Sequence, residues 1–443
     1  MELTNQQSQA IKYIVSLLMA GEDAALVGYA GTGKTTTATE LIKLLPSGWE
    51  VTFCAYTNKA TQVIERMLAY KGLAAQCKAR TIHSILNLNK EYIDQKTGER
   101  KFVKSNNPHT DLPKDESKHL LVIDEMGTVP CNEQAPLALM LLQLDNPKLF
   151  MGDPCQLPPV SEEYGVLFDL LDGYTTYLYN VVRYDGAILQ AATELRQKIK
   201  SYDALEVLEN ENDGDKGVFK VSSRQLKQAI SKFIKEDEYK ENKDFFKIIT
   251  YTNKAMDYWN DLVRYQLYAE QSERERFIVG SRIVALESCI AKEEVTCYQH
   301  RGKRTVKLMS SSEEGVIQNV IKGNCDLEGF DSPSLGLQTY YIEVTTEYGA
   351  EVTLHVIDEN YEEKLKRVLK DLAAKRKWKE FYLLKDYFHN INDAYSLTIQ
   401  RMQGSTCQHV VLDTENFNTC DNIWRRNRMF YTGLTRAEKR VYI

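Results

Sequence analysis

A glycine-rich segment near the N-terminus has the residue types of a phosphate-binding loop. Residues 28–35 read G-Y-A-G-T-G-K-T and fit the spacing G-x-x-x-x-G-K-[ST], after an apolar run and before a helical pattern. Glycines let backbone N–H groups curl around phosphates, Lys34 adds positive charge, and the Thr35 hydroxyl can ligate Mg²⁺. A solvated glycine-rich turn is the alternative. The residues predicted to hold ATP are Gly28, Gly31, Thr32, Gly33, Lys34, Thr35 and Thr36.

Two adjacent carboxylates follow a later apolar run. Asp124 and Glu125 come directly after residues 120–123, which read L-L-V-I. A carboxylate in this position can hold Mg²⁺, and a second one can orient or deprotonate the attacking water. We therefore predict that Asp124 binds the metal and that Glu125 activates the water. Capping of the next helix is the alternative for such a pair.

The elements that must position these groups are apolar runs alternating with helical patterns, which favours parallel sheets built from βαβ units. In the first half the expected strands are 24–27, 51–56, 120–123 and 148–151. A second set includes 247–251 and 409–412. This alternation predicts an α/β fold. The candidate site residues follow the ends of expected strands, which is where α/β folds place their sites.

Two insertions interrupt this pattern. The first is polar, about residues 87–117, with turn residues at 96–99 that Tyr92 and Phe102 flank, so a β-hairpin is expected. The second, about 280–357, is rich in β-branched residues and turn signals, which predicts a small β-barrel-like domain. The domains expected are therefore 1–175, then 176–279 together with 358–443, and the inserted 280–357.

Composition excludes few classes of function. The chain has 443 residues, 43% hydrophobic and 27% charged, as in ordinary globular proteins. Nine cysteines without a C-x-x-C pair favour reduced thiols, and no apolar run or signal peptide points to a membrane, so a cytoplasmic protein is expected. The net charge of −6 means that nucleic acid would have to bind along local basic tracks.

Further segments carry specific residue patterns. The most specific is 152–160, G-D-P-C-Q-L-P-P-V. The others are L-T-N-Q-Q at 3–7, A-Y-T-N-K-A at 55–60, T-I-H-S at 81–84, V-V-R at 181–183, T-I-Q-R-M-Q-G-S-T at 398–406 and Y-T-G-L-T-R-A at 431–437. Together with the phosphate loop they resemble the motifs of superfamily 1 helicases, most closely the RecD-like group and the Dda-type helicases of tailed phages. The resemblance covers both α/β halves and is weak in the insertions.

The resemblance implies two RecA-like domains with ATP and Mg²⁺ between them. Gln7 would contact adenine and Gln156 would sense the γ-phosphate. Arg183 and Arg436 would reach that phosphate from the second domain, Arg436 as an arginine finger, which links domain closure to hydrolysis. An ordinary salt bridge is the alternative for either arginine.

The segment at 398–406 departs from the family pattern T-x-H-K-x-Q-G-x-T. Gln400 and Arg401 replace the usual His-Lys, which keeps positive charge and leaves the role of position 400 open. Gln403 and Gly404 fit the pattern and are expected near the nucleotide. Movement in the 5′-to-3′ direction is implied by the resemblance to the RecD-like branch.

Single-stranded DNA should lie across both α/β domains, held by phosphate contacts and base stacking. By motif position the DNA-binding candidates are Thr57, Asn58, His83 and Thr398. Helix capping is the alternative for the polar residues, and a satisfied buried histidine is the alternative for His83.

Unwinding needs a feature that blocks the complementary strand. We predict that the hairpin is this pin and that Tyr92 or Phe102 stacks on the fork base pair, unless both aromatic rings pack the hairpin onto its own domain. A basic stretch at 364–379 either contacts DNA, braces the hairpin, or forms a solvated face over an apolar stripe.

The function expected is an ATP-dependent 5′-to-3′ DNA helicase that binds single-stranded and fork DNA. A translocase that displaces bound proteins, a DNA-binding scaffold with a decayed ATPase, and an RNA helicase are the alternatives. Intact Lys34, Asp124, Glu125, Gln156 and Arg436 oppose the decayed scaffold. Family resemblance favours a monomer, and single-stranded DNA-binding or replication proteins are conceivable partners.

Overall fold

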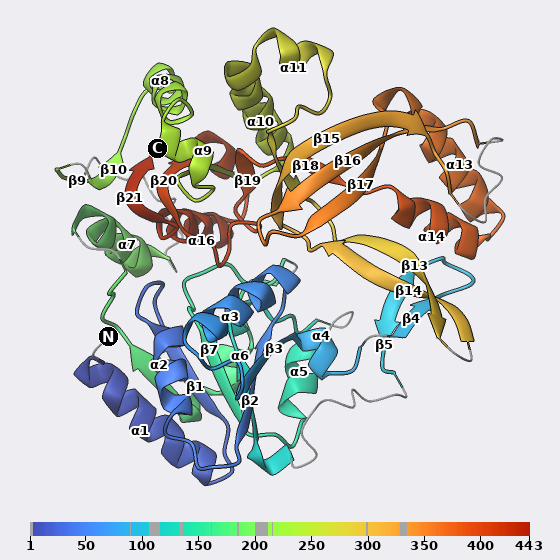
Figure 1. Ribbon diagram of the computed structural model, residues 1–443. Helices are drawn as coiled ribbons and strands as arrows, with labels where there is room; N and C mark the ends of the chain where they lie inside the picture. The colour runs from blue at the N-terminus through green and yellow to red at the C-terminus, as the bar shows by residue number, and fades with distance from the viewer. Residues whose placement is uncertain are drawn as a thin grey trace. The chain divides into compact units, whose positions relative to one another are not determined.

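The computed structural model describes residues 3–88, 90–105, 116–132, 136–160, 162–183, 186–199, 211–214, 216–297, 300–327 and 335–443. The chain forms two compact units (Figure 1). The first comprises Met1–Leu88, Asn106–Trp259 and Ser396–Ile443, and the second comprises Asn89–Ser105 and Asn260–Tyr395. Among the described residues, no helix combines the length and the apolar character needed to cross a membrane.

The first unit contains two sheets with their helices, called here the first and the second lobe. In the first lobe the strand order is β3-β2-β6-β7-β1-β8, and all neighbours are parallel. The strands are β1 (Ala24–Gly28), β2 (Glu50–Ala55), β3 (Cys77–Thr81), β6 (His119–Ile123), β7 (Lys148–Gly152) and β8 (Thr175–Leu178). Because the central strands are buried on both faces, they read as continuous apolar runs.

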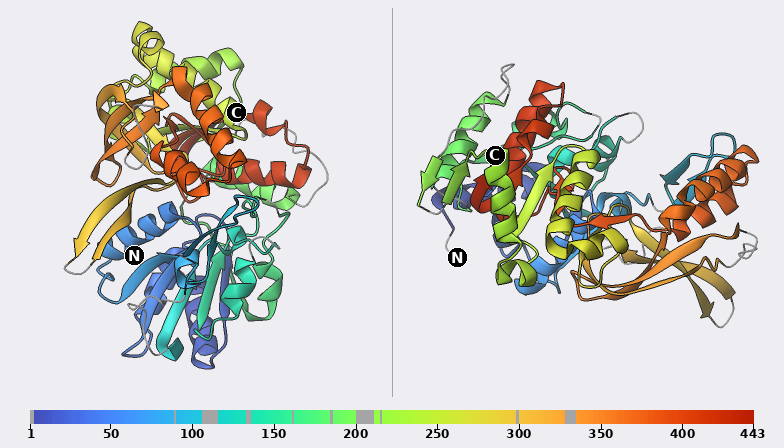
Figure 2. Two further views of the ribbon diagram at one scale, coloured as in Figure 1. Left: turned by 90° about the vertical axis from the view of Figure 1, so that its right-hand side faces the viewer. Right: turned by 90° about the horizontal axis from the view of Figure 1, so that it is seen from above.

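Helices cover both faces of this sheet (Figures 1 and 2). One core cluster joins the sheet to α1 (Asn5–Met19), α2 (Lys34–Ile42) and α3 (Asn58–Tyr70). A second cluster joins the other face to α4 (Ile82–Ile85), α5 (Leu137–Leu142) and α6 (Leu167–Leu170). Three short 3₁₀ turns complete the lobe: η1 (Glu116–Lys118), η2 (Met126–Thr128) and η3 (Asp172–Tyr174).

The second lobe has the strand order β19-β11-β20-β21-β10-β9, parallel except at the β9–β10 edge. Its strands are β9 (Glu211–Asp213), β10 (Lys216–Phe219), β11 (Phe246–Thr250), β19 (Ser396–Thr398), β20 (Cys407–Leu412) and β21 (Ala437–Tyr442). Its helices are α7 (Gly186–Lys198), α8 (Ser223–Phe233), α9 (Asp237–Glu241), α10 (Asn253–Tyr268), α15 (Thr414–Phe417) and α16 (Ile423–Leu434), of which α10 continues into the second unit.

The second unit is built on an antiparallel sheet of order β17-β16-β15-β12-β18. Its strands are β12 (Arg282–Ala285), β15 (Glu314–Asn324), β16 (Gln338–Thr346), β17 (Glu351–Ile357) and β18 (Ile391–Asp393). Two ribbons accompany it: β13 (Cys289–Cys297) with β14 (His300–Met309), and β4 (Lys90–Ile93) with β5 (Arg100–Val103). The helical elements are α11 (Glu270–Arg274), η4 (Glu359–Tyr361), α13 (Glu362–Ala374) and α14 (Trp378–Tyr387).

The predicted α/β class is confirmed, and every strand expected in the two α/β sets is present, within one residue at each end except that β20 begins at Cys407, two residues before the expected start. Two edge strands of the first lobe, β3 and β8, were missed because they read C-K-A-R-T and T-T-Y-L, without an apolar run. The first sheet therefore continues to Leu178, beyond the expected boundary at 175.

The second unit also differs in extent from the expected insertions. It runs over 260–395 rather than 280–357, because α13, α14 and β18 pack with the β strands, and it includes the hairpin. The sheet expected to be barrel-like has β17 and β18 at its edges. Part of the expected hairpin insertion, 106–115, lies outside the described residues.

Candidate nucleotide site and nucleic-acid contacts

The loop between β1 and α2 has the backbone conformation of a phosphate cradle. Gly31 and Gly33 have φ values of 82° and 81°, in the left-handed region that favours glycine. A Cβ on Gly28 would lie 2.6 Å from Thr32 Oγ1, and one on Gly33 would lie 2.7 Å from Gln7 Nε2. A Cβ at either position would therefore collide with its neighbours, and glycine is required there. The N-terminus of α2 lies at the end of this loop, and backbone N–H groups at a helix N-terminus attract phosphate.

Lys34 and Thr35 begin α2. The Lys34 ammonium donates to the carbonyl oxygens of Gly28 at 2.8 Å and Tyr29 at 3.3 Å. Phosphate oxygens would compete with these carbonyls for the ammonium, because a charged acceptor makes a stronger hydrogen bond. Thr35 and Thr36 are partly exposed in the first turn of the helix, so the Thr35 hydroxyl is available to a cation beside the cradle.

Asp124 and Glu125 follow β6, in the centre of the same sheet edge. Asp124 is anchored: its N–H donates to Cys54 O at 2.9 Å, and its Oδ1 accepts the Glu125 N–H at 2.9 Å. Burial, with the neighbouring charge of Glu125, raises the pKa of Asp124 to about 6, and Lys34 opposes this shift. A partly buried carboxylate held next to a phosphate loop is a suitable ligand for Mg²⁺, whose positive charge would offset the two carboxylates.

The turn after β7 carries two further groups. Asp153, only 3% exposed, accepts the Ala30 N–H on Oδ2 at 2.7 Å and the Cys155 N–H on Oδ1 at 2.9 Å. Gln156 is buried, and within the described part of the chain its Oε1 has no hydrogen-bond partner. An unpaired buried acceptor beside the loop is suited to a water or phosphate-bound group. Its role as γ-phosphate sensor stays a prediction.

Sequence reasoning missed Asp153 as a site residue. The signal was present: a carboxylate two residues after the apolar run 148–151, beyond Gly152. A third partner of Asp153, the Tyr431 hydroxyl of α16 at 2.8 Å, depends on the packing of the two lobes and has no signal in the sequence.

Gln7 supports the loop from outside. Its Oε1 accepts the Thr4 N–H at 3.0 Å in a capping box at the start of α1, and its Nε2 donates to Thr32 O at 3.2 Å. Both ends of the amide thus hold protein groups. Contact with adenine remains a prediction.

The two arginines expected at the γ-phosphate occupy different environments. Arg183 is exposed and follows Val182, whose N–H donates to Gly31 O at 2.8 Å, so it lies one residue from the loop. Arg436 is only 2% exposed. It donates to Thr432 O at 3.0 Å, Ser405 O at 3.3 Å and Thr435 Oγ1 at 3.2 Å, all within the second lobe. A finger role for Arg436 requires these hydrogen bonds to open, and it stays a prediction.

Arginines of the second lobe that do contact the first lobe were not predicted. Arg428 Nη2 donates to Pro154 O at 3.4 Å, and Arg425 Nη2 donates to Val160 O at 2.6 Å. Gln403 Nε2 donates to Leu157 O at 3.4 Å. Gly404, beside it, has a φ of 78° that permits the turn. These contacts all fall on the turn that carries Gln156, so the predicted residues 403 and 404 lie against that turn.

The DNA-binding candidates of the first lobe share one edge of its sheet. Thr57 caps α3 by accepting the Ala60 N–H at 3.2 Å, and Asn58 is the first residue of that helix. His83, on α4, has its ring 5.8 Å from the ring of Tyr56, which is exposed. Burial lowers the pKa of His83, so the ring is neutral at pH 7. The helix-capping alternative is thus confirmed for Thr57, and its DNA contact stays a prediction.

Thr398 ends β19 in the second lobe and is buried. Its carbonyl oxygen accepts the N–H groups of Arg401 at 2.9 Å and Met402 at 3.1 Å. The residue therefore shapes the turn that leads to Gln403. A direct DNA contact of Thr398 remains a prediction.

The hairpin β4–β5 exposes both predicted aromatic residues, Tyr92 at 51% and Phe102 at 58%. Tyr92 pairs with Lys101 and Phe102 pairs with Glu91, which puts the two rings on opposite faces of the ribbon. The exposure opposes the alternative that both rings pack the hairpin onto a domain.

The tip of the hairpin is held by α14 of the same unit. Trp378 Nε1 donates to Gln95 O at 3.0 Å, and Tyr382 Oη donates to Gly98 O at 2.7 Å. Arg100 forms an ion pair with Asp386 at 2.7 Å and lies 4.4 Å from the centroid of the Tyr382 ring. The basic stretch 364–379 therefore contacts the hairpin at its C-terminal end, through Trp378, as the bracing alternative expects.

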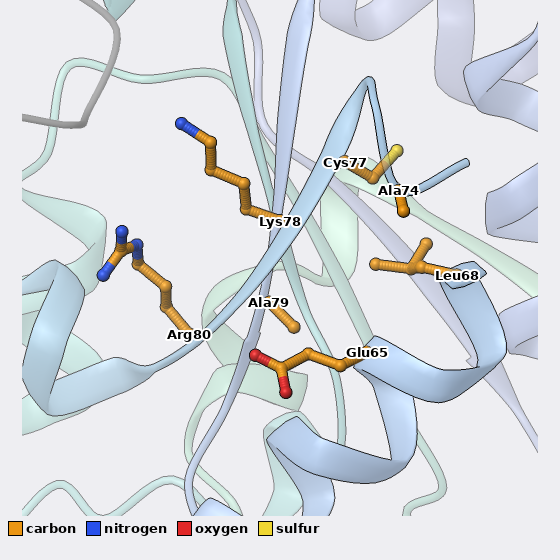
Figure 3. A pocket seen from close by; sticks show the side chains of 7 residues that line it. All are labelled: Glu65, Leu68, Ala74, Cys77, Lys78, Ala79 and Arg80. Carbon is orange, nitrogen blue, oxygen red and sulfur yellow. The ribbon is translucent and has the colours of Figure 1, made fainter. Parts of the chain in front are cut away.

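A surface cavity of about 370 Å³ lies away from these groups, at the edge strand β3 and helix α3 (Figure 3). Its lining residues are Glu65, Leu68, Ala74, Cys77, Lys78, Ala79 and Arg80. None of them belongs to the phosphate loop or its carboxylates. This cavity is distinct from the candidate nucleotide site.

Comparison with known families matches both ends of the chain. Residues 2–214 match the AAA domain, and residues 393–443 match the UvrD-like helicase C-terminal domain. The first match contains the phosphate loop, both carboxylates and Gln156. The second contains Gln403, Gly404 and Arg436.

Whole-chain relatives are distant. The chain is 23% identical to "Uncharacterized protein R530" of Acanthamoeba polyphaga mimivirus over 494 residues, covering 100% of this chain and 96% of the relative. A structure of Pif1 helicase from Bacteroides with ADP-AlF3 and single-stranded DNA is 16% identical, with a TM-score of 0.49 and coverage of 100% and 92%. Pif1 helicase from Candida albicans is 15% identical, with a TM-score of 0.46 and coverage of 100% and 95%.

Proposed function

We propose that this chain, an ATP-hydrolysing helicase of superfamily 1, moves 5′-to-3′ on single-stranded DNA and unwinds duplex DNA at a fork. The observation that carries the proposal is the convergence of the phosphate loop, Asp124, Glu125 and Gln156 on one sheet edge that a UvrD-like helicase C-terminal domain contacts. Direction is supported by the resemblance of residues 81–84 and 152–160 to the RecD-like, Dda-type branch.

The residues fit Mg²⁺ and ATP. The glycine cradle has no room for side chains, Lys34 can move from loop carbonyls to phosphate, and Thr35 with Asp124 provides oxygen ligands of the kind that Mg²⁺ prefers. The metal would neutralise charge on the β- and γ-phosphates. Glu125 would orient the attacking water, and exposed Arg183 would add positive charge as the phosphoryl group leaves.

Strand separation is assigned to the braced hairpin. A ring that blocks the complementary strand must be exposed and rigidly supported, and Tyr92 and Phe102 are exposed on a ribbon whose tip makes three polar contacts with α14. A translocase that displaces proteins without unwinding would have no use for such a support.

A strand-displacement assay tests the proposal. Duplexes with a 5′ or a 3′ single-stranded tail are incubated with ATP and Mg²⁺, with Lys34→Ala as the catalytically impaired variant and with ATPase readings on DNA and RNA. We expect unwinding of the 5′-tailed duplex alone and its loss in Lys34→Ala. One of Tyr92→Ala and Phe102→Ala should lower unwinding while ATPase continues, since the rings lie on opposite faces.

Other outcomes identify the alternatives. Hydrolysis stimulated by DNA without strand separation would favour the translocase, and unwinding from the 3′ tail would contradict the direction. Stronger stimulation by RNA would favour an RNA helicase. If no nucleic acid stimulates hydrolysis, the proposed motor function is wrong.

A further inference from the structure

Helices of the second lobe hold the phosphate loop at two neighbouring residues. The Ala30 N–H and the Tyr431 hydroxyl both donate to Asp153 Oδ2, at 2.7 and 2.8 Å, and the Ala30 nitrogen lies 3.3 Å from Tyr431 Oη. One residue earlier, the Arg196 guanidinium lies 4.1 Å from the centroid of the Tyr29 ring. Tyr431 belongs to α16 and Arg196 to α7. The loop therefore meets both helices at one place.

This junction is closed to water. Tyr431 is 0% exposed, and both Ala30 and Asp153 are buried. The Asp153 carboxylate accepts three hydrogen bonds, the third from the Cys155 N–H. A buried carboxylate that loses a donor pays a desolvation cost that no solvent molecule can relieve. The strength of the hydrogen bond from Tyr431 therefore depends on the charge of Asp153 beside the loop.

The two second-lobe helices contact each other. Asn427 of α16 donates to Lys198 O of α7 at 3.4 Å. Arg196 Nη2 donates to Thr193 Oγ1 at 2.5 Å, and within the described residues its buried Nη1 has no hydrogen-bond partner. The cation is therefore oriented toward the Tyr29 ring rather than spread over several acceptors. Displacement of the loop is expected to displace α7 and α16 together.

We propose that Tyr431 is a positioning residue that couples nucleotide binding in the phosphate loop to the second lobe through Asp153. Phosphate in the loop adds negative charge near the Asp153 carboxylate. The carboxylate then depends more strongly on its donors, so the bond from Tyr431 tightens. By thermodynamic reciprocity, a formed Tyr431–Asp153 bond favours the nucleotide-loaded loop. The proposal rests on the ATP-binding part of the proposed function and not on DNA or direction.

Hydrogen–deuterium exchange tests this coupling without nucleic acid. The full chain is compared with and without Mg²⁺ and adenylyl imidodiphosphate, following peptides from α2 (Lys34–Ile42) and α16 (Ile423–Leu434). In the unmodified protein the analogue should slow exchange in both helices. In Tyr431→Phe, which keeps the buried ring, α2 should respond as before, whereas the slowing in α16 should fall by about tenfold, the effect of one charge-assisted hydrogen bond.

The exchange results distinguish failure of the coupling from failure of the nucleotide site. Full slowing in α16 of Tyr431→Phe overturns the coupling role and leaves the nucleotide site intact. No slowing in α2 of the unmodified protein overturns the nucleotide site itself, and the coupling with it. Tyr239→Phe is the matched control, because it removes the hydroxyl of another buried tyrosine of the second lobe, on α9. Its exchange pattern should equal that of the unmodified protein.

A double-mutant cycle separates coupling from general destabilisation. Tyr431→Phe, Asp153→Asn and the double variant are compared by the ratio of ATPase rates with and without single-stranded DNA. If the two side chains act through one bond, the double variant loses no more than the worse single variant. Multiplication of the two losses would mean independent effects and would contradict the proposal.

Discussion

The carboxylates after β6 differ in how they are fixed. Asp124 is tied by backbone hydrogen bonds, whereas Glu125 has a φ of 51°, a left-handed conformation that costs a non-glycine residue on the order of 1 kcal/mol or more. The Glu125 carbonyl accepts the Thr128 N–H and hydroxyl, both at 2.8 Å, which holds this conformation. The chain therefore leaves the direction of β6 at Glu125.

Replacement of Glu125 by Gln should abolish turnover while nucleotide binding persists. The amide keeps the size of the side chain but cannot accept the proton of the attacking water, so kcat should fall about 10²–10⁴-fold. Steady-state ATPase and equilibrium binding of ADP measure the two effects. Glu116→Gln, at an exposed position of the same lobe, is the control. A loss of less than tenfold in Glu125→Gln would contradict the assigned role.

How far the sequence predicts the site depends on the range of the contacts. Lys34, Asp124 and Gln156 could be placed because each follows a strand end within a few residues of local pattern. Asp153 and Tyr431 could not be paired, since their hydrogen bond spans 278 residues and depends on how the two lobes pack. The burial of Arg436 likewise depends on tertiary packing, and its position in a sequence motif does not predict it.

At the scale of elements, the hairpin β4–β5 depends on a helix far away in the chain. A Cβ at Gly98, whose φ is 74°, would lie 2.3 Å from the Trp378 ring, so the turn and the ring fit only with glycine there. The sequence predicted the hairpin from its turn residues. Its support by α14 was one of several alternatives, because the residue types at 378, 382 and 386 do not indicate which residues they contact.

Trp378→Ala should loosen the hairpin without affecting the chemistry of ATP. The change removes the ring against Gly98 and the hydrogen bond to Gln95 O, so the tip loses support on one side. Unwinding of a tailed duplex should fall severalfold, while ATPase stimulated by single-stranded DNA stays within about twofold. Lys385→Ala, at an exposed position of α14 outside the basic stretch, is the control. Equal losses of unwinding and ATPase would show that the ring has a different role.

At the scale of the whole molecule, acid stability should depend on buried histidines. Burial, with the charges of Arg440 and Lys439, lowers the pKa of His409 from 6.5 to about 4. Its ring stacks on Phe233 at 4.7 Å. Between pH 6.5 and 4 the unfolded chain binds a proton that the folded chain does not, so this contribution to stability is lost as pH falls.

His409→Phe should therefore reduce the acid sensitivity of the first unit. The variant keeps a ring beside Phe233 and has no proton to bind, so between pH 7 and 4.5 its free energy of unfolding should fall by about 1–2 kcal/mol less than that of the unmodified chain. Thermal unfolding across this range is the measurement. Parallel pH dependence in both proteins would exclude His409 as the cause. His355, whose pKa is also lowered to about 4, is the corresponding residue of the second unit.

The second unit is assembled from two separate stretches of the chain, and this has a consequence for synthesis. The ion pair between Arg100 and Asp386 joins residues 286 positions apart. At roughly 5–20 residues per second, the ribosome needs about 15–60 s after making the hairpin before α14 is complete. During that time the first lobe can close its own sheet around the phosphate loop. The hairpin emerges as a ribbon without its partner, and it gains its support only after α14 has been made.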